Sequence, residues 1–239
     1  MSLLIESVVE FNDEGYLIYS SNYIGAYVRG RTKAEALKKF DKEIYQYIRW
    51  AKGKKCSKQE QFAIRINQEK KSDLQICDAD TDVLFESERA PLGREEYMEL
   101  KALVIKSARD FKILYQSIPD KQSTSLKTRK TFYGEIPRTA NEMYVHTNNM
   151  TNYYVGEIGV EVDNLPDILE SRINALRCVE TVPNYLNNPI YDGSYGEQWS
   201  LRKVLRRFIW HDRIHAKAMY RMAVCMWGEI IQDPFFFGW

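Results

Sequence analysis

The sequence predicts an α+β N-terminal domain followed by an all-α four-helix bundle. The chain has 239 residues, which exceeds the roughly 100–200 residues of a typical domain, so two modules are expected. Residues 1–89 contain short runs of alternating apolar residues, typical of strands, around one helix. From residue 90 onward, apolar residues recur at the three- and four-residue steps of amphipathic helices. We therefore place the domains at 1–89 and 90–239.

The composition indicates a protein that folds around a core and has no overall charge bias. Hydrophobic residues make up 44% and charged residues 28% of the chain, a balance that argues against a disordered protein. With 34 Lys and Arg against 33 Asp and Glu, the net charge is +1. This charge favours neither a nucleic acid nor a membrane surface as a partner. The sequence shows no secretory signal and no membrane-spanning stretch, so we expect a cytoplasmic protein.

The four cysteines are spread along the chain without a CxxC pair. This spacing favours reduced cytosolic thiols over a disulfide framework or a zinc knuckle. The residues are Cys56, Cys77, Cys178 and Cys225.

A hairpin and a helix are expected at the start of the N-terminal domain. Ile5–Phe11 and Tyr16–Ser20 are β-favouring runs, separated by turn residues that end in a glycine. After the segment Gly25–Gly30, a helix begins at Thr32, whose side chain forms a capping box with Glu35.

Further strands are expected after this helix, which ends near Gly53. Apolar residues alternate with others over Phe62–Ile66, as they do in a half-buried strand. Two later pairs repeat the alternation: Leu74 with Ile76, and Val83 with Phe85.

A glycine–threonine motif that leads into a helix relates this domain to a known family. The motif consists of Gly25, Gly30, Thr32, Glu35 and Ala36. Through it, the segment FNDEGYLIYSSNYIGAYVRGRTKAEALKKFDKEI resembles the HicB-like family. The resemblance implies a small α/β fold and a toxin partner, commonly with a DNA-binding segment downstream. Because no basic DNA-binding element follows here, we expect an accessory or dimer-forming role.

Four amphipathic helices are expected after Pro91. The first carries apolar residues from Tyr97 to Tyr115 and ends at Pro119. The exposed loop Asp120–Gly134 follows it.

The second and third helices have recognisable ends. Thr139 and Glu142 form a capping box at the start of the second helix. The third helix opens at Asn164, with Pro166 in its first turn, and Pro183 kinks or ends it.

The fourth helix carries two of the chain's three histidines. Ser200 caps this helix after the loop Asn187–Gln198. His211 and His215 lie on its apolar stripe, and His146 lies on the inward stripe of the second helix. Four such helices predict a bundle whose core sites are built from side chains on facing helices.

The spacing of the histidines predicts a metal site. An i,i+4 pair places two rings on one helix face about 5–6 Å apart at Cβ, which suits chelation of one ion. A zincin is excluded because Asp212 stands where the HExxH motif has its glutamate. Adding His146 gives three imidazole ligands with positions open to water or substrate, as in catalytic sites.

The alternative is that the histidines are hydrogen-bonded core residues. A single inward histidine is more often such a residue than a ligand. Without a metal, each of the three buried imidazoles would need its own hydrogen-bond partner, because an unpaired buried polar group costs about 1–3 kcal/mol of stability. One shared ion satisfies all three, so we assign the metal to His146, His211 and His215.

Two segments around these histidines resemble the DinB-like superfamily of metal-binding bundles. They are RTANEMYVHTNNMTNYYV, around His146, and EQWSLRKVLRRFIWHDRIHAKAMYRM, with its Trp199–Ser200 entry and the HxxxH pair. The superfamily is related to thiol-dependent transferases and mycothiol-dependent maleylpyruvate isomerase. The resemblance implies a long crossover between the second and third helices, a homodimer, and bound zinc or nickel, with iron or manganese as alternatives.

Other residues allow more than one interpretation. Glu142 lies one turn before His146 and suits a general base or a ligand-orienting acceptor, although its capping role already explains it. Five tyrosines suit either pocket lining or packing: Tyr144, Tyr153, Tyr154, Tyr191 and Tyr195.

The last helix is basic, and the chain ends in an apolar tail. The basic residues suit an anionic substrate, but those off the apolar stripe favour a solvated face or contact with a partner helix. We expect the tail PFFFGW to fold back onto apolar surface or onto a partner. The basic residues are Arg202, Lys203, Arg206, Arg207, Arg213, Lys217 and Arg221, of which Arg202, Arg206, Arg213 and Lys217 lie off the stripe.

Two functions remain open. The first is a metal-dependent transferase or hydrolase that activates a bound low-molecular-weight thiol or water. The second is a non-catalytic interaction module, of the antitoxin or stress-response type, with a structural metal or none. No residue stands out as a base or nucleophile, so the catalytic residues are not assigned.

Overall fold

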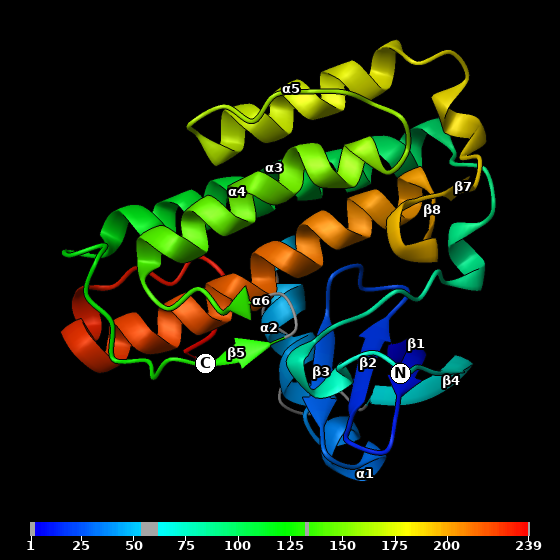
Figure 1. Ribbon diagram of the computed structural model, residues 1–239. Helices are drawn as coiled ribbons and strands as arrows, with labels where there is room; N and C mark the ends of the chain where they lie inside the picture. The colour runs from blue at the N-terminus through cyan, green and yellow to red at the C-terminus, as the bar shows by residue number, and fades with distance from the viewer. Residues whose placement is uncertain (1–2, 54–61, 132–133, 239) are drawn as a thin grey trace.

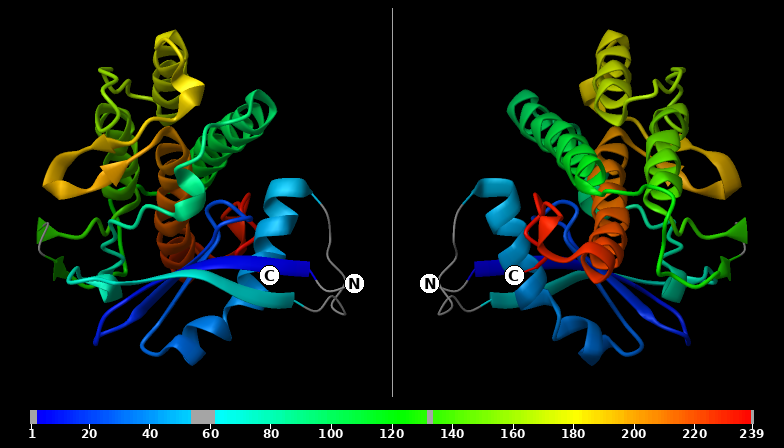
Figure 2. Two further views of the ribbon diagram at one scale, coloured as in Figure 1. Left: turned by 90° about the vertical axis from the view of Figure 1, so that its right-hand side faces the viewer. Right: turned by 90° about the vertical axis from the view of Figure 1, so that its left-hand side faces the viewer.

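The computed structural model describes residues 3–53, 62–131 and 134–238. A four-stranded mixed sheet lies against helices on both of its faces (Figure 1). Helix α6 (Leu201–Trp227) lies between this sheet and the outer helices (Figure 2). Within the described residues, no helix is long and apolar enough to span a membrane.

The sheet is built from a hairpin with a strand on each side. The predicted hairpin is confirmed: β1 (Leu3–Phe11) pairs antiparallel with β2 (Tyr16–Ser20). Strand β4 (Phe62–Lys71) pairs parallel with β1. Strand β3 (Tyr27–Gly30) pairs antiparallel with β2, giving the order β3-β2-β1-β4. The prediction missed β3, which has only four residues.

Helical residues 33–52 pack on one face of the sheet. Thr32 caps α1 (Lys33–Leu37) as expected, by accepting a hydrogen bond from the Glu35 amide. The helix is interrupted between Leu37 and α2 (Phe40–Lys52), so two helices stand where one was predicted.

The strands predicted at residues 74–76 and 83–85 are wrong. Ile76 begins a short 3₁₀ helix (Ile76–Asp78), and a second one (Glu86–Glu88) follows Phe85. Ile76, Val83 and Phe85 are buried in one cluster with Trp210 of α6. Leu84 between Val83 and Phe85 is buried as well, and these residues make no strand pairs in the described sheet.

Four long helices follow, and their caps are largely as predicted. Thr139 and Glu142 form the capping box of α4, and Ser200 caps α6. The N-cap of α5 is Asp167 in place of the predicted Asn164. Besides α6, these helices are α3 (Arg94–Ser117), α4 (Ala140–Gly156) and α5 (Ile168–Thr181).

A short two-stranded antiparallel sheet lies in each of the two regions predicted to be loops. In the first loop, β5 (Lys130–Thr131) pairs with β6 (Gly134–Glu135). In the second, β7 (Tyr191–Asp192) pairs with β8 (Gln198–Trp199). Short 3₁₀ turns lie at Tyr185–Asn187, Ser194–Gly196 and Gly228–Ile230.

The prediction of a separate all-α four-helix bundle is wrong. Every residue from Lys203 to Arg213 is buried, whereas a bundle helix buries only one face. The other side of α6 packs on the sheet, where Trp210 contacts the rings of Tyr19 and Tyr27. The fold is therefore α+β throughout, with α6 shared by the sheet and the outer helices.

Gly25, from the HicB-like motif, allows α6 to approach the sheet. Its φ is +95°, and a Cβ there would lie 2.3 Å from Cγ2 of Ile209. The buried core continues across the predicted boundary at residue 89. The division into domains at 1–89 and 90–239 stays a prediction.

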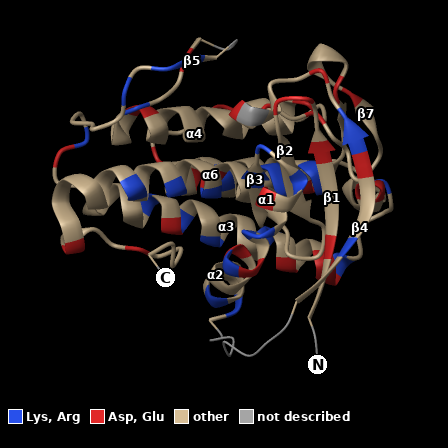
Figure 3. Ribbon diagram, turned by 90° about the horizontal axis from the view of Figure 1, so that it is seen from below, with Lys and Arg blue, Asp and Glu red and all other residues tan. Residues whose placement is uncertain are grey.

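Of the two alternatives for the basic residues off the apolar stripe of α6, a solvated face or contact with a partner helix, the solvated face is wrong for Arg206 and Arg213. The charged positions recur along α6 (Figure 3), but Arg206 is 1% exposed and Arg213 is fully buried. Arg213 lies 2.8 Å from a carboxylate oxygen of Glu43, which also contacts Lys217. Arg206 pairs in the same way with Glu88. These carboxylates come from the N-terminal part of the chain, so ion pairs help to hold the two parts together.

The C-terminal tail folds back onto apolar surface, as expected for its described residues. Phe235 is fully buried and stacks on Trp50 of α2 at a centroid distance of 5.4 Å. The backbone oxygen of Phe237 accepts a hydrogen bond from Gln46. The tail thus connects α2 to the end of α6, and Trp239 lies outside the described residues.

Candidate metal centre

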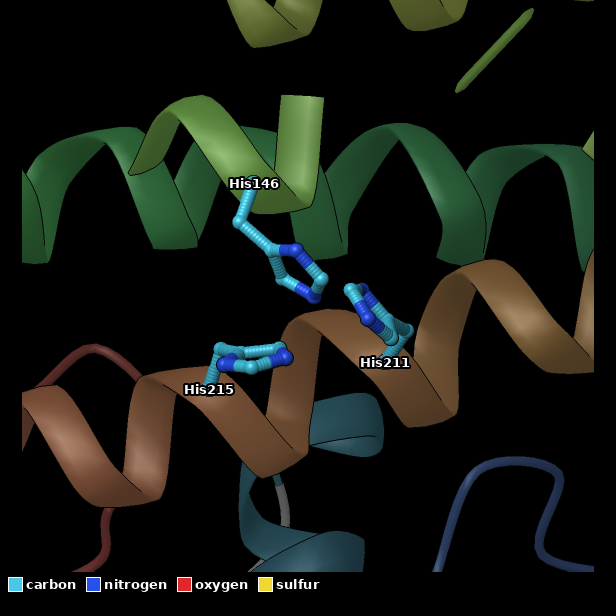
Figure 4. Close-up of side chains that lie close together, drawn as sticks. All are labelled: His146, His211 and His215. Carbon is cyan, nitrogen blue, oxygen red and sulfur yellow. The ribbon is translucent and has the colours of Figure 1, made fainter. Parts of the chain in front are cut away.

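Helices α4 and α6 bring all three histidines of the chain together. His146 projects from α4 toward His211 and His215 on α6 (Figure 4). The ring centroids are 5.1 Å apart for His146 and His211, 4.7 Å for His146 and His215, and 4.4 Å for His211 and His215. Each residue offers a ligand atom within 4.8 Å of those of the other two.

Local sequence explains why these side chains meet. His211 and His215 share one face of α6 because four residues separate them. His146 lies in the second turn of α4, after the capping box that fixes where the helix begins. A buried ion pair between Asp212 and Arg172 of α5, at 3.1 Å, ties α6 to the outer helices beside this face. The cluster therefore lies between two helices that pack against each other.

Burial keeps the three imidazoles neutral. His211 is 7% exposed, whereas His146 and His215 are partly exposed. Burial lowers the pKa of His146 below its usual value. Burial, then the charges of His215 and His146, lower the pKa of His211 much further. Burial and the neighbouring His146 bring the pKa of His215 to about 3. Neutral imidazole is the form that binds metal ions.

The donor set fits a divalent transition metal. The buried Nδ1 of His211 has no hydrogen-bond partner among the described residues, and such an orphan is costly unless something satisfies it. Imidazole nitrogens suit zinc, nickel and iron. Ligands of one tetrahedral zinc, at about 2.0–2.1 Å from the ion, lie roughly 3.4 Å apart. The ligand atoms here lie within 4.8 Å of one another, so binding requires them to approach by at most about 1.4 Å.

The nearby carboxylates point elsewhere. The Glu142 carboxylate accepts hydrogen bonds from the backbone amides of Thr139 and Arg138, and these hydrogen bonds lower the pKa of Glu142. Glu142 is thus held as a helix cap. Asp212 faces Arg172, and burial raises its pKa. Neither carboxylate belongs to the cluster of potential ligands found among the described residues.

Of the five candidate tyrosines, Tyr154 is the one in ring contact with the cluster. Its ring lies edge-on to His211 at 5.9 Å. Tyr144 stacks on Tyr115, and Tyr195 is 97% exposed. Tyr153 and Tyr191 instead line a separate open hollow of about 700 Å³, formed with Gly193 and neighbouring residues.

Residues beside the cluster were not predicted as site residues. Arg207 belongs to the basic run of α6, and it lies four residues before His211, so the two residues share a helix face. Tyr154 and Trp210 lie beside both residues, with the Arg207 guanidinium carbon 5.5 and 5.1 Å from their ring centroids. The same i,i+4 rule that paired the histidines could have found Arg207.

The two cysteines whose side chains the structure describes contribute no ligand to the cluster. Cys178 and Cys225 are free thiols, in agreement with the expectation for these two. Cys56 and the side chain of Cys77 lie outside the described residues.

The HicB-like and DinB-like resemblances rest on the sequence motifs alone and stay predictions. No protein-family model, curated protein or solved structure matches the chain.

Proposed function

We propose that this protein is a metal-dependent transferase or hydrolase that holds one divalent cation on His146, His211 and His215. The observation that carries the proposal is the convergence of every histidine of the chain on one point between α4 and α6. Zinc or nickel suits this donor set best, and iron or manganese are the alternatives. When bound, the cation would act as a Lewis acid that makes a thiol or water nucleophilic near neutral pH.

The protein itself supplies ligands, shape and access. The three imidazoles are already neutral, so binding displaces few protons near pH 7. His146 and His215 are partly exposed, so solvent reaches the cluster. The buried side is closed by Tyr154 and by the body of α6. Three protein ligands with one accessible side are typical of a catalytic site.

Metal binding is tested with protein purified without a nickel column or histidine tag. After dialysis against zinc or nickel, elemental analysis should find one ion per chain. His146→Gln, His211→Gln and His215→Gln should each remove stoichiometric binding. Val145→Gln is the matched control, because it places the same side chain at a neighbouring position that is 48% exposed. Wild-type protein without a stoichiometric ion would refute the proposal.

A non-catalytic module with a structural metal is the competing function. It is favoured by the engagement of Glu142 and Asp212 elsewhere, which leaves the cluster without an obvious general base. Cobalt-substituted protein separates the two functions. If small thiols change the visible spectrum of the cobalt, the ion has a position open to ligands, as an enzyme requires. An unchanged spectrum, with a large loss of thermal stability on metal removal, would favour the structural role.

A further inference from the structure

The open hollow lined by Tyr153 and Tyr191 has the size of a small-molecule site. Its volume is about 700 Å³, within the roughly 300–1,000 Å³ that such sites occupy. One wall is the end of α4 with the turn after it, and the other is the segment 191–194, which begins with β7. None of the three histidines lines the hollow, so it is a second site, separate from the candidate metal centre.

The hollow is lined by two carboxylates and by no cationic side chain. The carboxylates belong to Glu157 at the end of α4 and to Asp192 of β7. In the described part of the chain, neither of them forms an ion pair. A concave surface whose charges have one sign raises the local concentration of ions of the opposite sign. The hollow therefore favours a cation.

Glu157 is a buried charge without a counter-charge. It is 9% exposed, and its Oε2 accepts a hydrogen bond from the backbone amide of Ser194 at 2.7 Å. Burial and the charge of Glu157 raise the pKa of Tyr153, so the Tyr153 hydroxyl stays protonated and donates to Glu157. Both donors are neutral. A buried carboxylate is stabilised further by a cation, and a ligand in the hollow can supply one.

The loop after β7 is shaped around this carboxylate. A Cβ at Gly193 would lie 2.0 Å from Oε2 of Glu157, so glycine is required for the loop to approach so closely. Two residues later, Tyr195 has a φ of +59° and is 97% exposed. A left-handed backbone is rare for a bulky residue, and such strain is concentrated at binding and catalytic sites.

We propose that this hollow binds a small organic cation, a protonated amine whose carbon skeleton lies against the rings of Tyr153 and Tyr191. The ammonium group suits the carboxylates of Glu157 and Asp192, because charge-assisted hydrogen bonds are roughly twice as strong as neutral ones. The tyrosine rings add apolar contact and attract a cation to their faces. A neutral molecule of the same shape gains only the apolar contact.

The test compares an amine with the alcohol of the same skeleton on metal-free protein near pH 7. The probes are 2-phenylethylamine, which is protonated at this pH, and 2-phenylethanol, which is neutral. Removing the metal ensures that the amine has no metal ion to bind. NMR titration of nitrogen-labelled wild-type protein should show about 10- to 100-fold tighter binding of the amine. The largest shifts should fall on the backbone amides of Gly193 and Ser194.

Glu157→Gln should remove most of this preference, because it keeps the side-chain shape and an acceptor for Ser194 but loses the charge. Asp192→Asn should remove part of it, and since Asp192 is exposed, this variant keeps the test valid if Glu157→Gln does not fold. Asp73→Asn is the matched control, because Asp73 is an exposed aspartate that does not line the hollow. It should leave the preference unchanged.

Three results would overturn the inference: equal affinities of the wild type for amine and alcohol, amine-induced shifts that lie away from the hollow, or a preference that survives both Glu157→Gln and Asp192→Asn. None of them depends on whether the three histidines hold a metal. The inference and the proposed function are therefore tested separately.

Discussion

Replacement of Glu43 by glutamine should destabilise the protein strongly. Glu43 is 3% exposed, and its two oxygens contact Arg213 at 2.8 Å and Lys217. Burial alone would raise the pKa of Glu43, but Lys217 and Arg213 outweigh burial and hold it below its usual value. Glutamine keeps the shape but leaves two cations without a counter-charge. Removing one partner of a buried ion pair costs about 3–5 kcal/mol.

The expected result is a melting temperature lower by about 6–20 °C, since a chain of this size loses about 2–4 °C per kcal/mol. Circular dichroism of metal-free protein measures it. Glu69→Gln is the matched control: Glu69 also pairs with a lysine, Lys33 at 2.6 Å, but is 44% exposed, so the change should stay within about 1 kcal/mol. Equal small shifts for both variants would refute the claim that buried ion pairs hold α6 to the N-terminal part.

Two further predictions concern the packing of the C-terminal tail and the lowered pKa values of the histidines. Phe235→Ala should lower the free energy of unfolding by about 3–5 kcal/mol, because it removes a fully buried ring stacked on Trp50. Urea unfolding measures this free energy, and a loss below about 1 kcal/mol would contradict the packing of the tail. Metal-free protein should lose stability as the pH falls below about 6.5, because the unfolded chain binds protons there that His211 and His215, with their lowered pKa values, do not. The free energy of unfolding should fall by up to about 1.4 kcal/mol per pH unit for each histidine. His215→Gln should make the dependence of stability on pH less steep between pH 7.5 and 5.5, and an unchanged slope would contradict the lowered pKa of His215.

Local features of the fold could be predicted from the sequence. The hairpin between β1 and β2 and the caps at Thr32, Thr139 and Ser200 depend on residues within a few positions of each other. The approach of His211 to His215 is equally local. The approach of His146 could be foreseen only because both helices turn an apolar stripe inward.

Features that depend on distant residues could not be predicted. Strand β3 is defined by its pairing with β2, not by a pattern of its own four residues. Arg213 resembles a solvated residue until its partner Glu43 is known, and 170 positions separate the two. For the same reason α6 was placed in a separate bundle, although its other side packs on the sheet.

The most direct test of the metal centre is nitrogen NMR of histidine-labelled, untagged protein. The chain has three histidines, so all imidazoles are seen in one spectrum. Adding one equivalent of zinc should shift the ring nitrogens of His146, His211 and His215 together, with no further change beyond that equivalent. If fewer than three rings respond, or if the shifts continue without saturating, the chain does not hold one ion on its three histidines.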